Sequence, residues 1–278
     1  MDLPQVTDLA LSRRLERAEA KATAAYVESR ARVAPELAAE WRDVGGTYAM
    51  FDGVGSPLSQ TFGLGLFSEP TAAQLEEIES FFRDRGAEVF HEVSPLADLA
   101  VLTILPERGY RPVELTSVMH MHLPLRRPPR TKAPEITVRR IDPGEESMWA
   151  ETAARGWGES PELAAFVREL GVVTVRSKGA ASFVAELANQ PIAAAALAIH
   201  DGVALLAGAS TDPAFRGRGA QAALLSERLR HATAAGCDLA MMGALPGSAS
   251  QRNAERQGFQ IAYTRIKWQQ RSTPLLPA

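Results

Sequence analysis

Two arginines alternate with two glycines in the segment Arg216-Gly217-Arg218-Gly219, which runs directly into an amphipathic stretch. Glycine lets the backbone bend and approach a ligand closely, and the N-terminus of the following helix offers unpaired N–H groups and the positive end of a dipole. The two guanidinium groups add fixed positive charge beside those donors, which suits a phosphate ester. The pattern predicts a cradle for the diphosphate of a nucleotide-bearing cofactor, although a glycine turn that merely connects a strand to a helix gives the same short match.

The segments on either side of this turn are the ones that such a cradle needs. Residues 202–210 form a short apolar run that is typical of a buried strand, and the Asp212-Pro213 pair cannot continue a central strand. After the turn, Leu225 and Leu229 recur at helical spacing. The order of strand, glycine turn and helix therefore favours the cradle over an isolated turn.

These residues resemble the signature of the Gcn5-related N-acetyltransferase (GNAT) family, which is Arg or Gln, two residues, Gly, one residue, then Gly or Ala. The stretch Arg216-Gly217-Arg218-Gly219-Ala220-Gln221 matches its first four elements, but Gln221 stands where the family usually has a small residue. The resemblance covers residues 135–270: residues 236–246 resemble the family's next strand, and residues 250–268 resemble its final helix, Gly-Phe turn and strand.

The resemblance implies direct transfer of an acetyl group from acetyl-CoA to an amine, without a covalent enzyme intermediate. In the family the pantetheine arm lies between two strands that splay apart, here residues 202–210 and 238–245. A backbone N–H near Ala209, Ser210 or Thr211 is then expected to polarise the thioester carbonyl and to stabilise the tetrahedral oxyanion. The expected cofactor-binding residues are Ser210, Thr211, Arg216, Gly217, Arg218, Gly219, Ala220, Gln221 and Asn253.

The group that protonates the departing thiolate is not obvious from the sequence. The family uses a tyrosine four residues before the glycine of the Gly-Phe turn, and this position is Ala254 here. Ser250, one helical turn earlier, is the predicted substitute. Ser248, Ser250 and Asn253 are equally suited to bind the pantetheine amides or to cap and solvate the start of a helix.

A general base and an acceptor pocket must come from segments outside the apolar strand at 203–209, which contains no carboxylate. Glu186 is the predicted base, with Glu159 or Glu162 as alternatives, and each also fits a solvated surface charge. Trp157, Glu159 and Glu162 follow the first helix of the second half, where relatives build the acceptor pocket, so they indicate a cationic amine substrate. The competing interpretation of Trp157 is a core tryptophan on an ordinary loop.

The composition is that of an ordinary globular enzyme. The chain has 278 residues, 46% hydrophobic and 23% charged, which is enough for two modest domains. A net charge of -3 gives no argument for a nucleic-acid or membrane partner, and the N-terminus lacks the features of a secretory signal, so we expect a cytoplasmic protein. The one cysteine, Cys237, excludes an internal disulfide, and His120 and His122 lack the further ligands of a metal site.

A faint internal duplication divides the chain. Short matches share nearly one offset, for example residues 85–89 with 235–239 and 108–110 with 257–259, although coincidental turns remain an alternative. The first copy has no arginine-glycine loop, and Thr71 and Gln74 form a capping box that satisfies its helix. The proline-rich basic segment at 124–134 is predicted to be a linker. Exposure of its basic side chains to solvent is favoured over nucleic-acid binding as the explanation of its charge.

The sequence therefore predicts a mixed α/β fold of two tandem GNAT-like domains, each with a mostly antiparallel sheet flanked by helices. Residues 1–123 form a degenerate domain without a phosphate loop, 124–134 the linker, and 135–278 the acetyl-CoA-binding domain. The predicted function is N-acetyltransferase, with acetyl-CoA as cosubstrate and a small-molecule or peptide amine as acceptor. The alternative is a non-catalytic acyl-CoA-binding sensor.

Overall fold

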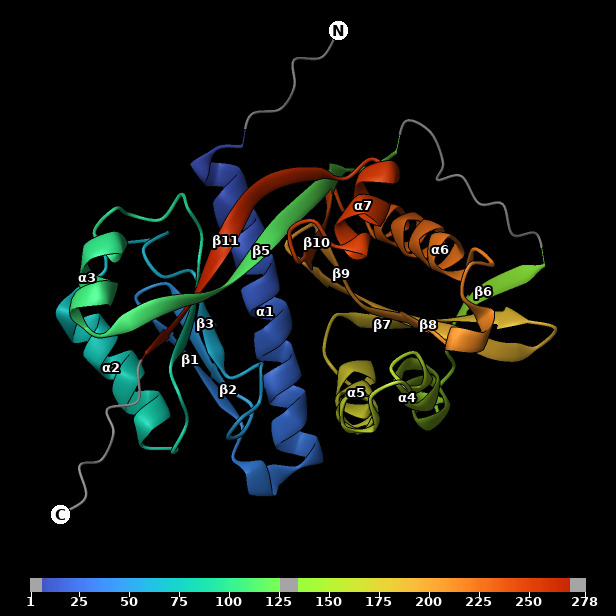
Figure 1. The fold of residues 1–278 in the computed structure, drawn as a ribbon, viewed down its shortest axis with the longest axis horizontal. Coiled ribbons are helices and arrows are strands. Elements are labelled where there is room, and N and C mark those ends of the chain that lie inside the picture. Colours follow the sequence, from blue (N-terminus) through green and yellow to red (C-terminus); the bar gives the residue numbers. More distant parts are fainter. Residues whose placement is uncertain (1–6, 126–134, 271–278) are drawn as a thin grey trace, which may run out of the picture. The chain divides into compact units, whose positions relative to one another are not determined.

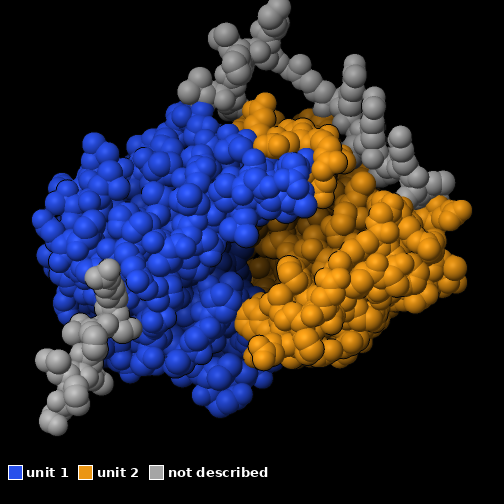
Figure 2. Space-filling model, in the orientation of Figure 1, with its two compact units in different colours: residues 1–119, 243–252, 261–278 blue, residues 120–242, 253–260 orange. Residues whose placement is uncertain are grey.

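The computed structural model describes residues 7–125 and 135–270. By its contacts the chain divides into two compact units, shown in different colours in Figure 2. Unit 1 comprises Met1–Met119, Gly243–Arg252 and Ile261–Ala278, and unit 2 comprises His120–Met242 and Asn253–Gln260. The domain boundaries expected from the sequence stay a prediction, and residues 126–134 of the expected linker lie outside the described residues.

Both halves of the chain contain helices and strands (Figure 1). The first half contains α1 (Leu9–Val33), the 3-10 helix η1 (Pro35–Leu37), β1 (Glu40–Val44), β2 (Thr47–Phe51), β3 (Gln60–Phe62), α2 (Ala72–Arg83), β4 (Phe90–Val93), α3 (Val101–Glu107) and β5 (Tyr110–His122). The second half contains β6 (Ile136–Arg140), α4 (Glu146–Arg155), α5 (Pro161–Val175), β7 (Ala180–Leu187), β8 (Gln190–His200), β9 (Val203–Thr211), η2 (Pro213–Phe215), α6 (Ala220–Ala234), β10 (Leu239–Ala244), α7 (Ala249–Arg256) and β11 (Gln260–Gln270).

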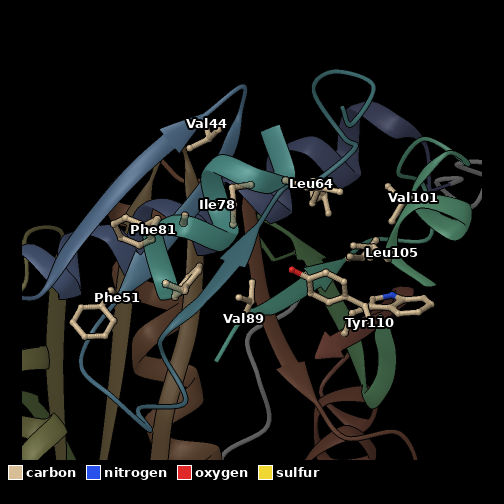
Figure 3. Close-up of a cluster of buried hydrophobic side chains, with 14 residues drawn as sticks. Val44, Phe51, Leu64, Ile78, Phe81, Val89, Val101, Leu105 and Tyr110 are labelled. Carbon is tan, nitrogen blue, oxygen red and sulfur yellow. The ribbon is translucent and has the colours of Figure 1, made fainter. Parts of the chain in front are cut away.

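The core of unit 1 lies on both faces of its strands, because side chains alternate along β2. Tyr48 and Met50 pack with the buried alanines of α1, whereas Ala49 and Phe51 pack with α2 on the other face. Figure 3 shows this second cluster, to which α2, β4 and α3 contribute large buried side chains. Unit 1 therefore has a core of its own, to which Trp268 of β11 also contributes.

The start of α2 is satisfied by its own side chains, which bears on whether the first half has a phosphate loop. Thr71 Oγ1 accepts a hydrogen bond of 3.1 Å from the backbone N of Gln74, as the capping box predicts. The side chain of Gln74 does not return to Thr71, and its Nε2 instead donates to Val44 O at 2.7 Å. The helix terminus is thus capped, while the second half of the predicted box is replaced by a bond to β1.

In unit 2 the helices cover opposite faces of the strands: α4 and α5 lie on one side of β7 and β8, and α6 lies on the other (Figure 1). Trp149 of α4 is buried against Ala194 and Ala196 of β8, and its Nε1 donates to Phe183 O at 2.9 Å. Residues 193–196 are all alanine, so both helix layers are able to approach β8 closely.

The strand connections of the two halves repeat one pattern. β1, β2 and β3 are antiparallel neighbours, and after α2 the chain returns in β4, parallel to β3. β7, β8 and β9 are likewise antiparallel neighbours, and after α6 the chain returns in β10, parallel to β9. A repeated topology of this kind is what a duplication produces.

By their hydrogen bonds the eleven strands of the described residues belong to one mostly antiparallel sheet, in the order β1-β2-β3-β4-β11-β5-β10-β9-β8-β7-β6. The expectation of a separate sheet in each half is corrected by this order. β11, the last strand of the described residues, pairs antiparallel with β4 of the first half, with Ile266 opposite Val93. Such long-range pairing depends on tertiary packing, which local sequence patterns do not encode.

Candidate functional site

The arginine-glycine turn lies between the end of β9 and the start of α6, within unit 2, so the predicted order of strand, turn and helix is confirmed. Gly217 has φ +78° and Gly219 has φ +92°, a left-handed conformation that glycine adopts without strain. Gly219 is the N-cap of α6, and no side chain caps this helix. Because a side chain at Gly217 would meet open space, the loop leaves room for a ligand beside the free N–H groups of the first turn.

Arg216 joins the turn to the connection between α4 and α5. Its Nη1 lies 3.1 Å from Glu159 Oε1, and its Nη2 donates to Gly156 O at 3.0 Å. Both partners of this ion pair are well exposed, so it contributes little to stability. The Cζ atom of Arg218 lies 5.7 Å from the centre of the Phe215 ring, so its guanidinium stays next to the turn.

Gln221 has a structural role that the sequence did not indicate. Its Nε2 donates a hydrogen bond of 2.7 Å to Thr211 Oγ1 and thereby links the first turn of α6 to the last residue of β9. Ala220 beside it is buried. At the position where the family signature has a small residue, this chain therefore has a side chain that stabilises the loop by a hydrogen bond.

β9 and β10 diverge soon after they begin, as the resemblance predicts for the strands that receive a pantetheine arm. Their parallel pairing covers three residue pairs, from Val203 opposite Leu239 to Leu205 opposite Met241. Beyond this point Ala207, Gly208 and Ala209 are exposed although they lie within a strand. Their backbone is therefore accessible to a ligand.

A β-bulge lies in the same part of β9, on the side that pairs with β8. Ala194 pairs with Ser210 and Ala196 pairs with Ala207, so two residues of β9 stand opposite the single residue between them on β8. One of the two is Gly208, with φ +60°. A bulge bends its strand and re-aims the backbone groups that follow it.

Ser210 is buried at the end of β9, and its Oγ donates to Ala153 O of α4 at 2.7 Å. Gly156, at the end of α4, packs directly against it, since a Cβ atom on Gly156 would lie 2.4 Å from Ser210 Cβ. The hydroxyl of Ser210 thus fixes the strand to α4, and its backbone groups are the ones left for a ligand.

Glu186, the predicted base, lies on β7, two strands away from β9. Its carboxylate accepts from Arg139, with Nη2 at 3.0 Å, and the same guanidinium makes two hydrogen bonds to Glu145. Glu145 and Glu186 hold the pKa of the Arg139 guanidinium above its usual value, and Arg139 in turn lowers the pKa of Glu145 to about 2. The structure therefore places Glu186 in an ion pair and does not bring it to the turn.

The remaining residues predicted for proton transfer or pantetheine binding lie on or near α7. Ser250 is exposed in the first turn, and Ser248 Oγ accepts from the backbone N of Gln251 at 3.1 Å, which is the helix-capping role that the sequence left open. Asn253 Oδ1 accepts from Arg256 at 2.8 Å. Ala254 is 3% exposed, so the position of the family's tyrosine is part of the core.

The predicted acceptor residues lie on the connection between α4 and α5 and on the first turn of α5. Trp157 is 44% exposed, so it is not a core residue; the buried tryptophan of this region is Trp149. Glu159 is exposed and ion-paired to Arg216, and Glu162 lies in the first turn of α5. An exposed indole ring is suited to contact a cation, and both carboxylates follow it closely along the chain.

Within residues 7–125 and 135–270, no group of three or more His, Cys, Asp or Glu side chains is placed to hold a metal ion. His120 and His122 lie with their ring centres 5.6 Å apart. Cys237 is buried, and this burial raises the pKa of its thiol. Among the same residues, no helix combines the length and the apolar character required to cross a bilayer.

A glycine turn on an uncapped helix, next to two diverging strands, is the arrangement that the resemblance to the acetyltransferases predicts, and comparison with known families agrees with this resemblance. Residues 139–249 match the family model of the acetyltransferase (GNAT) domain. This match assigns residues 139–249 to the GNAT acetyltransferase domain, a family whose members depend on acetyl-CoA. No curated protein sequence matches the chain.

Solved structures of GNAT proteins share the fold. A GCN5-related N-acetyltransferase from Kribbella flavida is 19% identical, with a TM-score of 0.62 over 92% of this chain and 96% of its own. One from Sphaerobacter thermophilus is 18% identical, with a TM-score of 0.54 over 76% of this chain and 71% of its own. A tandem GNAT protein from the clavulanic acid biosynthesis pathway is 13% identical, with a TM-score of 0.56 over 82% of this chain and 79% of its own.

Proposed function

We propose that this protein is an N-acetyltransferase that transfers an acetyl group from acetyl-CoA directly to a primary amine. The observation that carries the proposal is the combination of an uncapped glycine turn at the start of α6 with the divergence of β9 from β10. The turn offers an anion site, and the divergence leaves strand backbone accessible for an extended ligand. A plain connecting turn accounts for neither the free helix terminus nor the exposed strand residues.

The residues present fit acetyl-CoA, whose thioester supplies the activated acetyl group. The N–H groups of Ala220 and Gln221 and the guanidinium groups of Arg216 and Arg218 would hold the diphosphate. Backbone groups of β9 between Ala207 and Thr211 would bind the pantetheine arm, and an N–H near Ala209, Ser210 or Thr211 would stabilise the oxyanion. A preorganised donor of this kind is worth about 3 kcal/mol in the transition state.

For the remaining steps the proposal assigns candidate roles. Ser250 is the candidate proton donor to the thiolate, Glu186 is the candidate base, and Asn253 is a candidate ligand of the pantetheine arm. Trp157, Glu159 and Glu162 are candidates for recognising the acceptor, a small-molecule or peptide amine with positive charge. Neither a nucleic-acid nor a membrane partner is proposed.

The first half is proposed to be a degenerate GNAT-like domain in tandem with the second, with boundaries at 1–123 and 135–278. The repeated strand connections of the two halves and the likeness to a tandem GNAT protein support this. Since Thr71 caps α2, the equivalent helix of the first half lacks a free terminus, and we propose that acetyl-CoA binds only to the second half.

Calorimetric titration of acetyl-CoA into the wild-type protein and a Gly217→Glu variant tests the cofactor site. The new carboxylate would face open space beside the cradle and repel the diphosphate, so we expect binding to be lost. Gly236→Glu is a matched control, because Gly236 follows the other end of α6 with φ +81° and an equally open Cβ position. Absence of binding to the wild type would overturn the proposal.

A non-catalytic acyl-CoA sensor is the second candidate, because the position of the family's tyrosine holds the buried side chain of Ala254. A screen of amines that follows the release of free CoA thiol separates the two functions. An acetyltransferase releases thiol in step with acceptor, whereas a sensor binds acetyl-CoA and releases none with any amine.

A further inference from the structure

Arg228 of α6 is a buried cation whose hydrogen bonds go to backbone carbonyls. The residue is 4% exposed, and burial lowers the pKa of its guanidinium to about 10, so it remains charged at neutral pH. Its Nη1 donates to Ala196 O at 3.1 Å and to Ala207 O at 3.4 Å, and its Nε donates to Leu224 O at 3.3 Å. In the part of the chain that the structure describes, no carboxylate pairs with it.

The two strand carbonyls that Arg228 reaches belong to the residue pair that borders the bulge. Ala196 and Ala207 pair with each other, and the next pair is Ala194 with Ser210. Gly208 lies in the extra part of β9 between them, with φ +60°. One guanidinium therefore ties β8, β9 and α6 together at the point where β9 bends.

The bend decides where the exposed backbone of β9 points. Ala207, Gly208 and Ala209 are exposed, and β9 has already parted from β10 at Leu205. The register of a strand pair is able to shift by one residue at a bulge unless contacts from outside that pair fix it. A cation that bonds both carbonyls at its border supplies such a fixed point.

We infer that Arg228 is a positioning residue for acyl-CoA: it holds the bulge of β9 so that the backbone from Gly208 to Ser210 receives the pantetheine arm and the thioester. The inference rests on the proposed function of this site. A second consequence follows from its charge, since a buried cation with no carboxylate partner leaves a positive potential behind the strand that faces the developing oxyanion.

A residue that only stabilises the fold would have different consequences. Its loss would destabilise the whole of unit 2 and lower the affinity of the site for every ligand to the same degree. Loss of a positioning residue weakens the ligand part that lies along β9 and spares the part at the α6 terminus. ADP carries the diphosphate without a pantetheine arm, so it reports on the terminus, whereas acetyl-CoA reports on both.

Calorimetric titration of ADP and of acetyl-CoA into wild type, Arg228→Met and Arg228→Lys tests this. We expect Arg228→Met to weaken acetyl-CoA binding about tenfold or more and to leave ADP affinity within about twofold, since a misplaced contact acts only on the groups it aligns. Arg228→Lys keeps the charge but places its donors on a single nitrogen, so it should recover part of the loss. Arg218→Met is the matched control, because it removes a cation of the cradle and should weaken both ligands.

The outcomes separate the inference from the proposed function. A wild-type protein that binds no acetyl-CoA overturns the proposed function and the inference with it. A wild type that binds, with Arg228→Met weakened equally for both ligands or for neither, overturns the positioning role alone. If Arg228→Met does not fold, amide hydrogen exchange at Gly208–Ser210 in Arg228→Lys decides: faster exchange confined to this segment supports the role, and unchanged exchange overturns it.

Discussion

The side-chain amide of Gln221 and the hydroxyl of Thr211 are joined by a hydrogen bond of 2.7 Å across the glycine turn. The bond connects the last residue of β9 to the first turn of α6, so the two ends of the loop are held at a fixed separation. Thr211 is buried, which protects the bond from competition by water. A residue that departs from the family signature thus stabilises the loop that the signature describes.

Gln221→Ala restores the small residue of the signature and removes this bond. We expect the free energy of unfolding to fall by about 1 kcal/mol and the affinity for acetyl-CoA to fall a few-fold. The substitution removes one hydrogen bond across the loop and leaves the buried apolar side chains in place. A double-mutant cycle with Thr211→Val measures the coupling, which should be about 0.5–1.5 kcal/mol by chemical denaturation. Additive effects of the two substitutions would show that the bond contributes nothing.

Gly156→Ala tests the packing of α4 against the end of β9. A Cβ atom there would lie 2.4 Å from Ser210 Cβ and 3.0 Å from Thr211 N, so either the helix end or the strand must move. We expect a loss of about 1–3 kcal/mol in stability and weaker acetyl-CoA binding, measured by denaturation and calorimetry. Ser210→Gly in the same chain removes the closer obstacle and should restore part of both; no recovery would place the strain elsewhere.

The local features of the site could be predicted from the sequence because they depend on neighbouring residues. The positive φ angles of Gly217 and Gly219, the strand before them and the helix after them follow from residue types within one segment. The cap of Thr71 on Gln74 has the same local origin. Turns and helix caps depend on residues three or four positions apart, so the local amino-acid sequence is enough to predict them.

Features that join distant segments could not be predicted in this way. The pairing of β11 with β4 and the hydrogen bonds of Arg228 to two strand carbonyls depend on packing between elements. The contact of Arg216 with Glu159 spans 57 residues, and both were singled out from the sequence for separate roles. No periodicity or motif encodes such contacts, because they depend on how the helices pack against the sheet.

Glu186→Gln tests the candidate base. A positioned base contributes about a hundredfold or more, so we expect kcat to fall by that factor with the acceptor found in the amine screen, while KM for acetyl-CoA stays nearly constant. Glu145→Gln removes the other carboxylate from Arg139 and leaves Glu186 in place, so it is the matched control. If both variants lose similar stability and neither loses kcat, Glu186 serves only the ion pair with Arg139.

Glu16 makes the stability of the protein depend on pH around neutrality. The carboxyl group is buried, and this burial outweighs the attraction of Arg265 and raises its pKa from 4.5 to about 7. Tyr263 Oη donates to it at 2.8 Å, and Glu19 and Glu92 share the same guanidinium. Because the folded state holds this proton more tightly than the unfolded chain, the stabilising contribution is complete below pH 4.5 and is lost as the pH rises through 7.

We therefore expect the free energy of unfolding to fall between about pH 5 and pH 8, with Glu16 contributing on the order of 3 kcal/mol to the change. The raised pKa of Glu92 acts in the same direction. Glu16→Gln keeps the shape and an acceptor for Tyr263 but cannot ionise, so denaturant titrations at a series of pH values should give a flatter profile. Glu77→Gln, the same change at an exposed position of α2, should leave the slope unaltered. A profile that Glu16→Gln does not flatten would mean that another group binds the proton on folding, with Glu92 the next to test because it faces the same guanidinium.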